Sequence, residues 1–425
     1  QPLFNTITYK TEKYGHNCNK QVWGLWADNN RQIWLGGEGE LGIYKEGKEI
    51  EIIPLNQCRL NKQTHISVIH QDKHGDLWLG THKHGVAIYH PDTKRITCIG
   101  DDKDGSLDIL CFYEDTDGKI WIGTQSGLYS AYNRELTQED KINRLLTNKG
   151  IRSILKDKNG KLWIGAKGLF LFDDKGQLFQ ELTTEQSFPI RSVNYLMEDS
   201  RKRIWVGTND GILVFRDASH LEDYSHYGTK EGLQNTNVRA IQEDHDGTIW
   251  LSTNAGISRL DEKTKTFYNY NHYDGVPMGD FMDGSTCIST DGILYFGSQG
   301  GACYFTPGEV NSIRKPAPVT ITQFSIYDKQ TESKDTEHPL PLTDANIQLP
   351  YNQNTFKISF NVLDYAISSQ VEFSYILEGL ENTWYNTQGE KQIIFRNIPP
   401  GHYTFKVKTR LRNQEWEKDE ATLHI

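Results

Sequence analysis

One phrase, WADNNRQIWLGG at residues 26–37, recurs along this chain and decides how it folds. Five further copies are HQDKHGDLWLGT (70–81), YEDTDGKIWIGT (113–124), LKDKNGKLWIGA (155–166), MEDSRKRIWVGT (197–208) and QEDHDGTIWLST (242–253). The motif aromatic residues are Trp34, Trp78, Trp121, Trp163, Trp205, Trp250 and, by position, Tyr295. They are spaced by 44, 43, 42, 42, 45 and 45 residues. This period matches one four-stranded blade of a β-propeller.

Each copy has the pattern of a strand, a tight turn and a second strand. The aspartate six residues before the aromatic residue can accept a backbone N–H two residues on. Glycine usually stands three residues before the aromatic residue, where the turn needs positive φ. Arg31 and Lys202 replace that glycine, so we expect these two turns to be strained or differently shaped. The large aromatic faces are predicted to pack between blades and not to bind ligand.

The seventh copy, CISTDGILYFGSQGGACYFTP (287–307), departs from the pattern and lacks a fourth strand. Ser289 replaces the aspartate and Tyr295 the tryptophan. A spare strand, LFNTITYK (3–10), precedes the first copy. Pairing this N-terminal strand with the last blade closes the ring and removes exposed sheet edges. The sequence therefore predicts an all-β fold whose first domain, residues 1–312, is a seven-bladed propeller.

After residue 312 the motif disappears and half-buried strands follow, such as NTFKISFNVLDY (354–365) and HYTFKVKTRL (402–411). Tyr403 stands just after a Pro-Pro-Gly turn, which is the place of a tyrosine corner in immunoglobulin-like sandwiches. Residues 313–425 are predicted to form a β-sandwich of immunoglobulin or fibronectin III type.

Composition excludes several classes of protein. The formal net charge is -10 without a basic block, so nucleic-acid binding is not expected. No apolar run approaches the length of a membrane span, and no signal peptide opens the chain. The six cysteines contain no C-x-x-C pair, so neither a zinc site nor a dense disulfide framework is predicted. We expect a soluble globular piece of a longer protein, with no cofactor.

The motif D-x-x-G-x-(I/L)-W-(I/L/V)-G-T-x-x-G-(I/L) resembles the two-component regulator propeller repeat. YILEGLENTWYNT (375–387) and IPPGHYTFKVKTRL (398–411) resemble the Tyr-rich sandwich, the YYY domain, that follows such propellers. The seventh copy is similar to the last blade before that sandwich. Together these features resemble the periplasmic sensor region of hybrid two-component systems of Bacteroidetes type, over nearly the whole chain.

This resemblance implies a function and its partners. Such sensors detect oligosaccharides, form homodimers through the sandwich, and signal through a membrane helix to a cytoplasmic histidine kinase. The chain is then expected to be the periplasmic domain of an inner-membrane protein and to carry no kinase activity itself. Family members often carry two propellers, whereas one is found here.

Propeller topology places the loops between second and third strands on the same face as the connections into the first strands. Amides, carboxylates, lysine and histidine on that face suit a hydroxyl-rich ligand. The candidate ligand-binding residues are Glu38, Glu40, His65, His82, His84, Gln125, Lys167, Asn209, Asp210, Asn235, Asn254 and Gln299. Solvated loops without a ligand are the alternative for each residue.

Two other patterns lead to expected absences. Histidines are frequent in blade 2, but they stand at different ends of the blade, so no metal site is predicted. Cys98 and Cys111 lie on the last strand of one blade and the first strand of the next, and no disulfide is expected between them.

Two other functions were considered beside sensing. A propeller lyase of the streptogramin type needs a histidine and an acid at the channel mouth, for which only His84 with Glu38 or Glu40 qualifies. A protein-binding scaffold would instead need a large exposed apolar patch on one propeller face. No catalytic residue is predicted.

Overall fold

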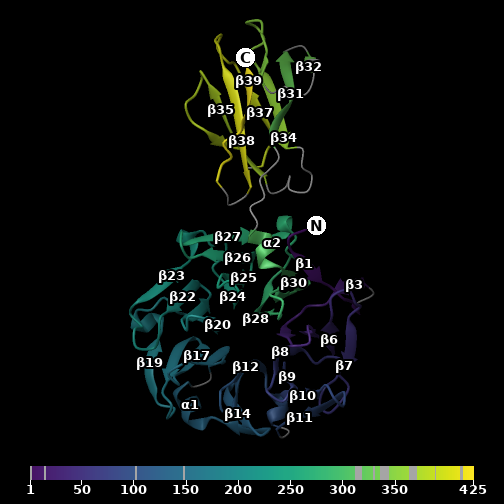
Figure 1. Cartoon of the computed structure of the whole chain (residues 1–425), viewed down its shortest axis with the longest axis vertical. Helices are drawn as coiled ribbons and strands as arrows, with labels where there is room; N and C mark the ends of the chain where they lie inside the picture. Colours follow the sequence, from purple (N-terminus) through teal and green to yellow (C-terminus); the bar gives the residue numbers. More distant parts are fainter. Residues whose placement is uncertain are drawn as a thin grey trace. The chain divides into compact units, whose positions relative to one another are not determined.

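The computed structural model describes residues 2–13, 16–100, 103–146, 149–311, 318–328, 331–335, 344–362, 371–387, 389–411 and 415–425. The chain divides into two compact units, residues 2–311 and residues 312–425, and each is treated by itself (Figure 1).

The first unit is a ring of four-stranded antiparallel sheets, called blades 1 to 7 in chain order (Figure 1). Blade 1 contains β4 (Gly24–Ala27), β5 (Ile33–Gly36), β6 (Glu40–Tyr44) and β7 (Glu51–Pro54). Blade 2 contains β8 (Ile66–Gln71), β9 (Leu77–Thr81), β10 (Val86–His90) and β11 (Arg95–Cys98). Blade 3 contains β12 (Ile109–Glu114), β13 (Ile120–Thr124), β14 (Gly127–Tyr132) and β15 (Glu135–Gln138).

The next three blades repeat this order. Blade 4 contains β16 (Ser153–Lys156), β17 (Leu162–Ala166), β18 (Gly168–Phe172) and β19 (Leu178–Leu182). Blade 5 contains β20 (Val193–Glu198), β21 (Ile204–Thr208), β22 (Gly211–Phe215) and β23 (Tyr224–Tyr227). Blade 6 contains β24 (Val238–Glu243), β25 (Ile249–Thr253), β26 (Gly256–Asp261) and β27 (Thr266–Tyr270).

Blade 7 is closed by the N-terminus. It contains β28 (Phe281–Ile288), β29 (Leu294–Ser298) and β30 (Gly301–Phe305), and β1 (Asn5–Ile7) pairs antiparallel with β30 as its outer strand. Seven four-stranded sheets thus lie within the described residues, which confirms the predicted all-β propeller and the predicted closure by the N-terminal strand.

Short elements connect the blades. A hairpin of β2 (Lys10–Lys13) and β3 (His16–Asn19) follows the closing strand. The helical turns η1 (Asp104–Ser106), η2 (Thr184–Gln186), η3 (Thr229–Glu231) and η4 (His272–Asp274) and the helix α1 (Asp140–Leu145) lie in connections into the following blade. The helix α2 (Pro307–Asn311) follows β30.

The repeated aspartate holds the turn and the tryptophan of its blade together. Asp28 Oδ1 accepts the N–H groups of Asn30 at 2.8 Å and Gln32 at 3.0 Å, and Oδ2 accepts the indole N–H of Trp34 at 2.9 Å. Blades 2 to 6 repeat the indole bond at 2.8 to 3.1 Å. The predicted bond to the N–H two residues on is confirmed. The indole bond was not predicted.

The tryptophans fill the space between neighbouring blades. Trp163 is fully buried and its ring centroid lies 5.9 Å from that of Phe215 in blade 5. The ring centroid of Trp250 in blade 6 likewise lies 4.7 Å from that of Phe305 in blade 7. Because each large ring contacts the next blade, burying it stabilises the ring as a whole as well as its own sheet.

The turns without glycine keep their shape and carry backbone strain. Arg31 has φ 59° and Lys202 has φ 66°, whereas Gly75 at the same position has φ 89°. The Lys202 N–H donates to the Asp199 carbonyl just as the Gly75 N–H donates to the Asp72 carbonyl. The prediction of strained turns is therefore confirmed, since a residue with a Cβ is held in the left-handed region.

The second unit is a sandwich of two sheets. One sheet has the order β32 (Thr331–Asp335), β31 (Val319–Asp328), β34 (Phe356–Val362) and β37 (Gln392–Phe395). The other has the order β33 (Ala345–Asn346), β39 (Glu420–His424), β38 (Thr404–Leu411), β35 (Val371–Glu378) and β36 (Tyr385–Asn386). Phe360, Phe373 and Phe405 pack in the core between them. The Tyr403 hydroxyl donates to the Pro399 carbonyl at 2.8 Å, which confirms the predicted tyrosine corner.

The aspartate bonds can be tested by mutation. Asp157→Asn removes the charge that accepts from Asn159, Lys161 and Trp163, and we expect a loss of at least about 2 kcal/mol of unfolding free energy in urea. Asp173→Asn is the matched control, because Asp173 accepts the same two backbone N–H groups in an exposed turn but no indole. Equal losses in the two variants would show that the indole bond contributes nothing.

The strained turns give a second test. We expect Arg31→Gly to raise the unfolding free energy by about 0.5–1 kcal/mol, because the relief of left-handed strain exceeds the added chain entropy. Gly160→Ala serves as the reverse change, since φ is 77° and no atom lies within 4 Å of the added Cβ. It should lower the unfolding free energy through backbone strain alone. An unchanged midpoint for both variants contradicts the strain account.

Candidate functional site

The first strands of the blades surround a central channel, and the start of each strand lines its mouth. A cavity of about 400 Å³ runs along this channel, and the part of its wall at the mouth includes Trp23, Ser67, Leu110, Arg152 and Gly284. These residues share one place in the repeat, five residues before the turn aspartate or Ser289. The complete set at this place is Trp23, Ser67, Leu110, Arg152, Asn194, Arg239 and Gly284. We call this set the mouth ring.

The mouth ring differs in chemistry from blade to blade. Two residues further on, the chain has Leu25, Ile69, Phe112, Ile154, Leu196 and Ile241 in blades 1 to 6, and Thr286 in blade 7. In the mouth ring the side chain changes from indole to hydroxyl, guanidinium and amide. The residue type at this place in the repeat is therefore not determined by packing between the blades.

Three charged residues join blades 4, 6 and 7 across the mouth. Arg239 Nη1 donates to Asp283 Oδ1 at 2.9 Å. Arg152 Nη1 lies 3.7 Å from Asp283 Oδ2. The side chains of Arg152 and Asp283 are 43% and 37% exposed, so solvent and a ligand can reach them. Two guanidinium groups from different blades therefore share one carboxylate.

Amides hold these arginines in place. Arg152 Nη1 donates to the Asn194 side-chain oxygen at 3.1 Å, and the buried Asn194 amide donates to Asn237 and to the Val238 carbonyl. Arg239 Nε donates to Asn254 Oδ1 at 2.7 Å. The two guanidinium groups are thereby oriented at the mouth without a ligand, as a preformed polar site requires.

Asp283 lies in an irregular part of β28. Phe281 pairs with Ser298, but the next pair is Thr286 with Phe296, so the residues between do not follow the regular register with β29. Gly284 has φ 66° and lies against the ring of Tyr195. Burial raises the pKa of Tyr195 to about 12, so this hydroxyl stays neutral at the mouth.

The opposite side of the mouth is aromatic. The rings of Trp23 and His65 lie 5.2 Å apart, and those of His65 and His82 lie 6.4 Å apart. His82 Nδ1 lies 3.0 Å from Asp108 Oδ2, and His65 Nε2 lies 4.0 Å from Glu38 Oε1. Three of the predicted residues, Glu38, His65 and His82, are thus brought together beside an indole.

The other predicted residues are dispersed. Glu40 forms an ion pair with the buried Lys20. His84 contacts the His82 carbonyl within its own turn. Asn254 joins the arginine network, as described above. The remaining candidates lie on separate loops or turns of this face: Gln125, Lys167, Asn209, Asp210, Asn235 and Gln299.

Sequence reasoning missed Trp23, Arg152, Asn194, Arg239 and Asp283. It selected loops, whereas these residues lie at or just before the first strands. The residue type within the mouth ring changes from blade to blade, but the positions one and three residues further on vary as much, so the sequence alone does not single out these residues. Nothing in the sequence marks Asp283 either, because it stands in the irregular strand of the most divergent repeat.

A disulfide joins Cys58 in the β7–β8 connection to Cys98 in β11. Cys98 does not pair with Cys111, as expected, but its bond to Cys58 was not predicted. Cys111 is buried and free, and burial raises its pKa to about 12. The pairing follows from the position of the connection, which crosses from blade 1 to blade 2. The bridge restrains the segment that leads to His65 at the mouth.

Histidines of blade 2 pair with acids in separate places. His70 Nε2 lies 2.9 Å from Glu114 Oε2, and His90 Nδ1 lies 3.0 Å from Asp76 Oδ1. No group of three or more metal-ligating side chains occurs in the described part of the chain. His84 does not meet Glu38 or Glu40 among the described residues, so the acid–base pair that the lyase hypothesis needs is not assembled.

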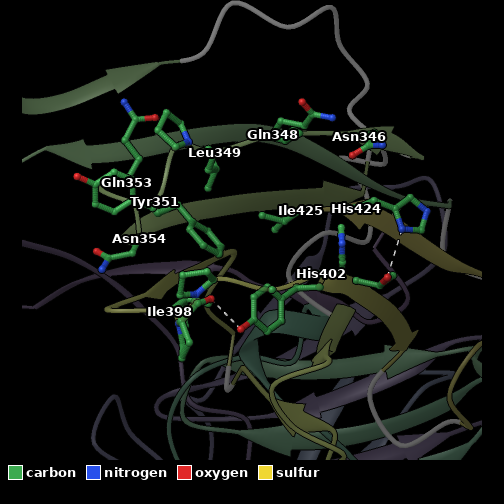
Figure 2. A pocket seen from close by; sticks show the side chains of 18 residues that line it. Asn346, Gln348, Leu349, Tyr351, Gln353, Asn354, Ile398, His402, His424 and Ile425 are labelled. Carbon is green, nitrogen blue, oxygen red and sulfur yellow. Dashed lines mark hydrogen bonds between the residues drawn. The ribbon is translucent and has the colours of Figure 1, made fainter.

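The sandwich has a cavity of its own, of about 650 Å³ (Figure 2). Tyr351, Asn354, His402 and His424 line it, together with the tyrosine corner. The dashed lines in Figure 2 mark the bond from Tyr403 to Pro399 and that between Thr404 and His424. The lining contains amides, histidines and an exposed tyrosine but no arginine, lysine or carboxylate side chain.

Family models match both units. The two-component regulator propeller model matches residues 105–126, 145–168, 187–210 and 232–255, and the Y_Y_Y domain model matches residues 364–425. The first unit thus carries two-component regulator propeller repeats, and the second matches a Y_Y_Y domain. This confirms the resemblance that the repeat and the Tyr-rich segment indicated.

Two relatives are similar to this chain over most of its length. The crystallised extracellular domain of a hybrid two-component system from B. thetaiotaomicron is 36% identical, with a TM-score of 0.88, and the match covers 100% of this chain and 57% of that one. Histidine kinase P4 of Formosa agariphila is 27% identical over 379 residues, which are 84% of this chain and 24% of that protein. The propeller with its Y_Y_Y domain therefore corresponds to only part of each relative.

More distant structures share the fold alone. Virginiamycin B lyase from Staphylococcus aureus is 11% identical, with a TM-score of 0.55 over 71% of this chain. Among the described residues, no helix is long and apolar enough to cross a membrane.

The disulfide can be tested by mutation. Cys58→Ser should lower the unfolding free energy by about 2–4 kcal/mol, because the bridge closes a loop across a sequence separation of 40 residues. Cys303→Ser, at a buried free cysteine, is a control for the loss of a thiol. If dithiothreitol lowers the midpoint of the parent protein but not that of Cys58→Ser, the bridge is the cause. Equal sensitivity of both proteins contradicts the assignment.

Proposed function

We propose that this chain is the extracytoplasmic sensor region of a hybrid two-component histidine kinase and that it recognises an oligosaccharide at the mouth of the propeller. The similarity of the whole chain to the extracellular domain of the B. thetaiotaomicron system is the observation that carries the proposal. The proposed location is the periplasm, in a protein anchored in the inner membrane.

The chemistry of the mouth supports a sugar as the ligand. Trp23 and His65 offer two adjacent aromatic rings, and the arginines and amides on the other side offer fixed donors and acceptors. Aromatic surfaces beside planar polar groups match the apolar faces and the hydroxyls of a sugar ring. Among the described residues that line the sandwich cavity, no side chain carries a guanidinium or carboxylate group, which favours the mouth as the site.

The same proposal assigns a role to the sandwich. Two copies would associate through their Y_Y_Y domains, and ligand binding would favour one arrangement of the pair. The signal would then pass through a membrane helix to the kinase in the remainder of the protein. The chain itself would bind without catalysing a reaction.

Thermal unfolding with a panel of neutral and acidic oligosaccharides tests the proposal. A ligand at 100 times its dissociation constant adds about 2.7 kcal/mol to the unfolding free energy and raises the midpoint. We expect at least one glycan to do so selectively, and we expect Trp23→Ala to abolish the shift. A panel that shifts no midpoint contradicts the oligosaccharide assignment.

Tyr351→Ala is the matched control, since Tyr351 is an exposed aromatic residue of the sandwich cavity. It should leave the shift unchanged. A shift that survives Trp23→Ala and disappears in Tyr351→Ala would move the binding site to the sandwich.

A further inference from the structure

We propose that the mouth takes a ligand that bears a carboxylate, and that this carboxylate replaces Asp283 between Arg152 and Arg239. The inference rests on the proposed sensor function and names the class of its ligand. Asp283 lies between the two arginines, at the position that we assign to the ligand's acid group.

The contacts of Asp283 are unequal. The carboxylate lies 2.9 Å from Arg239 Nη1 but 3.7 Å from Arg152 Nη1. Among the described residues, Nε and Nη2 of Arg152 make no hydrogen bond, although the side chain is held by Asn194. One edge of this guanidinium is thus available. A carboxylate binds such an edge through two parallel hydrogen bonds, which a neutral hydroxyl cannot do.

Further cationic residues lie on this face of the propeller. Lys149, Lys167 and Arg191 stand in connections or turns of blades 3 to 5. Acidic residues, such as Asp210 and Asp280, stand on the same face as well. The preference for an anion therefore rests on the two guanidinium groups that face Asp283.

The backbone around Asp283 allows the replacement. Residues 282–285 lie at the register shift between β28 and β29, and Gly284 provides a backbone position with positive φ. Asp283 can therefore move away without breaking the paired end of the strand at Thr286. The ligand's sugar ring would then lie toward Trp23 and His65 on the opposite side of the mouth.

The position of the present occupant indicates a carboxylate in preference to a sulfate ester. The site is already shaped around a planar two-oxygen acid, since each oxygen of Asp283 faces a different arginine. A uronic acid carries the same group.

Calorimetric titration tests the inference. The ligands are trisaccharides of galacturonate, mannuronate and guluronate, and the affinity of each acid is compared with that of its carboxyl methyl ester. We expect one acid to bind at least about 10-fold more tightly than its ester, because the ester cannot form the paired charged bonds. Arg152→Gln should remove this preference, whereas Arg201→Gln, on an exposed turn at the opposite end of the strands, should preserve it.

Asp283→Asn distinguishes displacement of Asp283 by the ligand from a direct contact between Asp283 and the ligand. If Asp283 competes with the ligand, the variant should bind the acid several-fold more tightly and the ester unchanged, and Asp280→Asn should change neither. Weaker binding of the acid to Asp283→Asn would overturn the inference. An unchanged unfolding midpoint of each variant shows that the fold is retained.

The outcomes also distinguish this inference from the proposed function. If acid and ester bind equally, or if only neutral glycans bind, the carboxylate assignment is wrong and the oligosaccharide sensor stands. If no acid, ester or neutral glycan binds, both assignments are contradicted.

Discussion

The bond between the turn aspartate and the indole of its blade is the constraint on which the propeller depends. One buried carboxylate satisfies two backbone N–H groups and one indole N–H, so the turn and the tryptophan cannot be placed independently. A buried indole without this acceptor would leave a donor unsatisfied, which costs more than a hydrogen bond contributes. Since the oriented ring then packs against the next blade, a local turn fixes a contact between blades.

This arrangement leaves the mouth free to vary. The turns and the tryptophans determine how the blades assemble, so residues at the starts of the first strands need not resemble one another. The chain has Trp23 in one blade, and Arg152 and Arg239 in others, at the same place in the repeat. A site of low symmetry can therefore form on a scaffold of high symmetry, because the residues that determine assembly and those that face the channel are different.

The sequence was sufficient for the scaffold but only partly for the site. Period, turn residues and the spare N-terminal strand specified seven blades and their closure, because each depends on contacts that every repeat makes. The bridge between Cys58 and Cys98 depends instead on where one connection crosses its neighbour. The approach of Arg152 to Asp283 joins blades far apart in the sequence, and it also needs the irregular course of β28. No local sequence pattern predicts such a contact between residues of distant blades.

Blade 7 differs from the others in its turn and in its outer strand. Ser289 replaces the aspartate and accepts the N–H of Ile293, so no carboxylate joins its turn to the aromatic residue of the blade. Its outer strand is the three-residue β1, which is contributed by the N-terminus. Functional elements that move are drawn from the less stable parts of a fold. Asp283 stands in this blade, and its two arginines stand in blades that have the full aspartate bond. A ligand that displaces Asp283 would therefore act on a blade without the carboxylate–aromatic bond, while blades that have this bond hold the arginines.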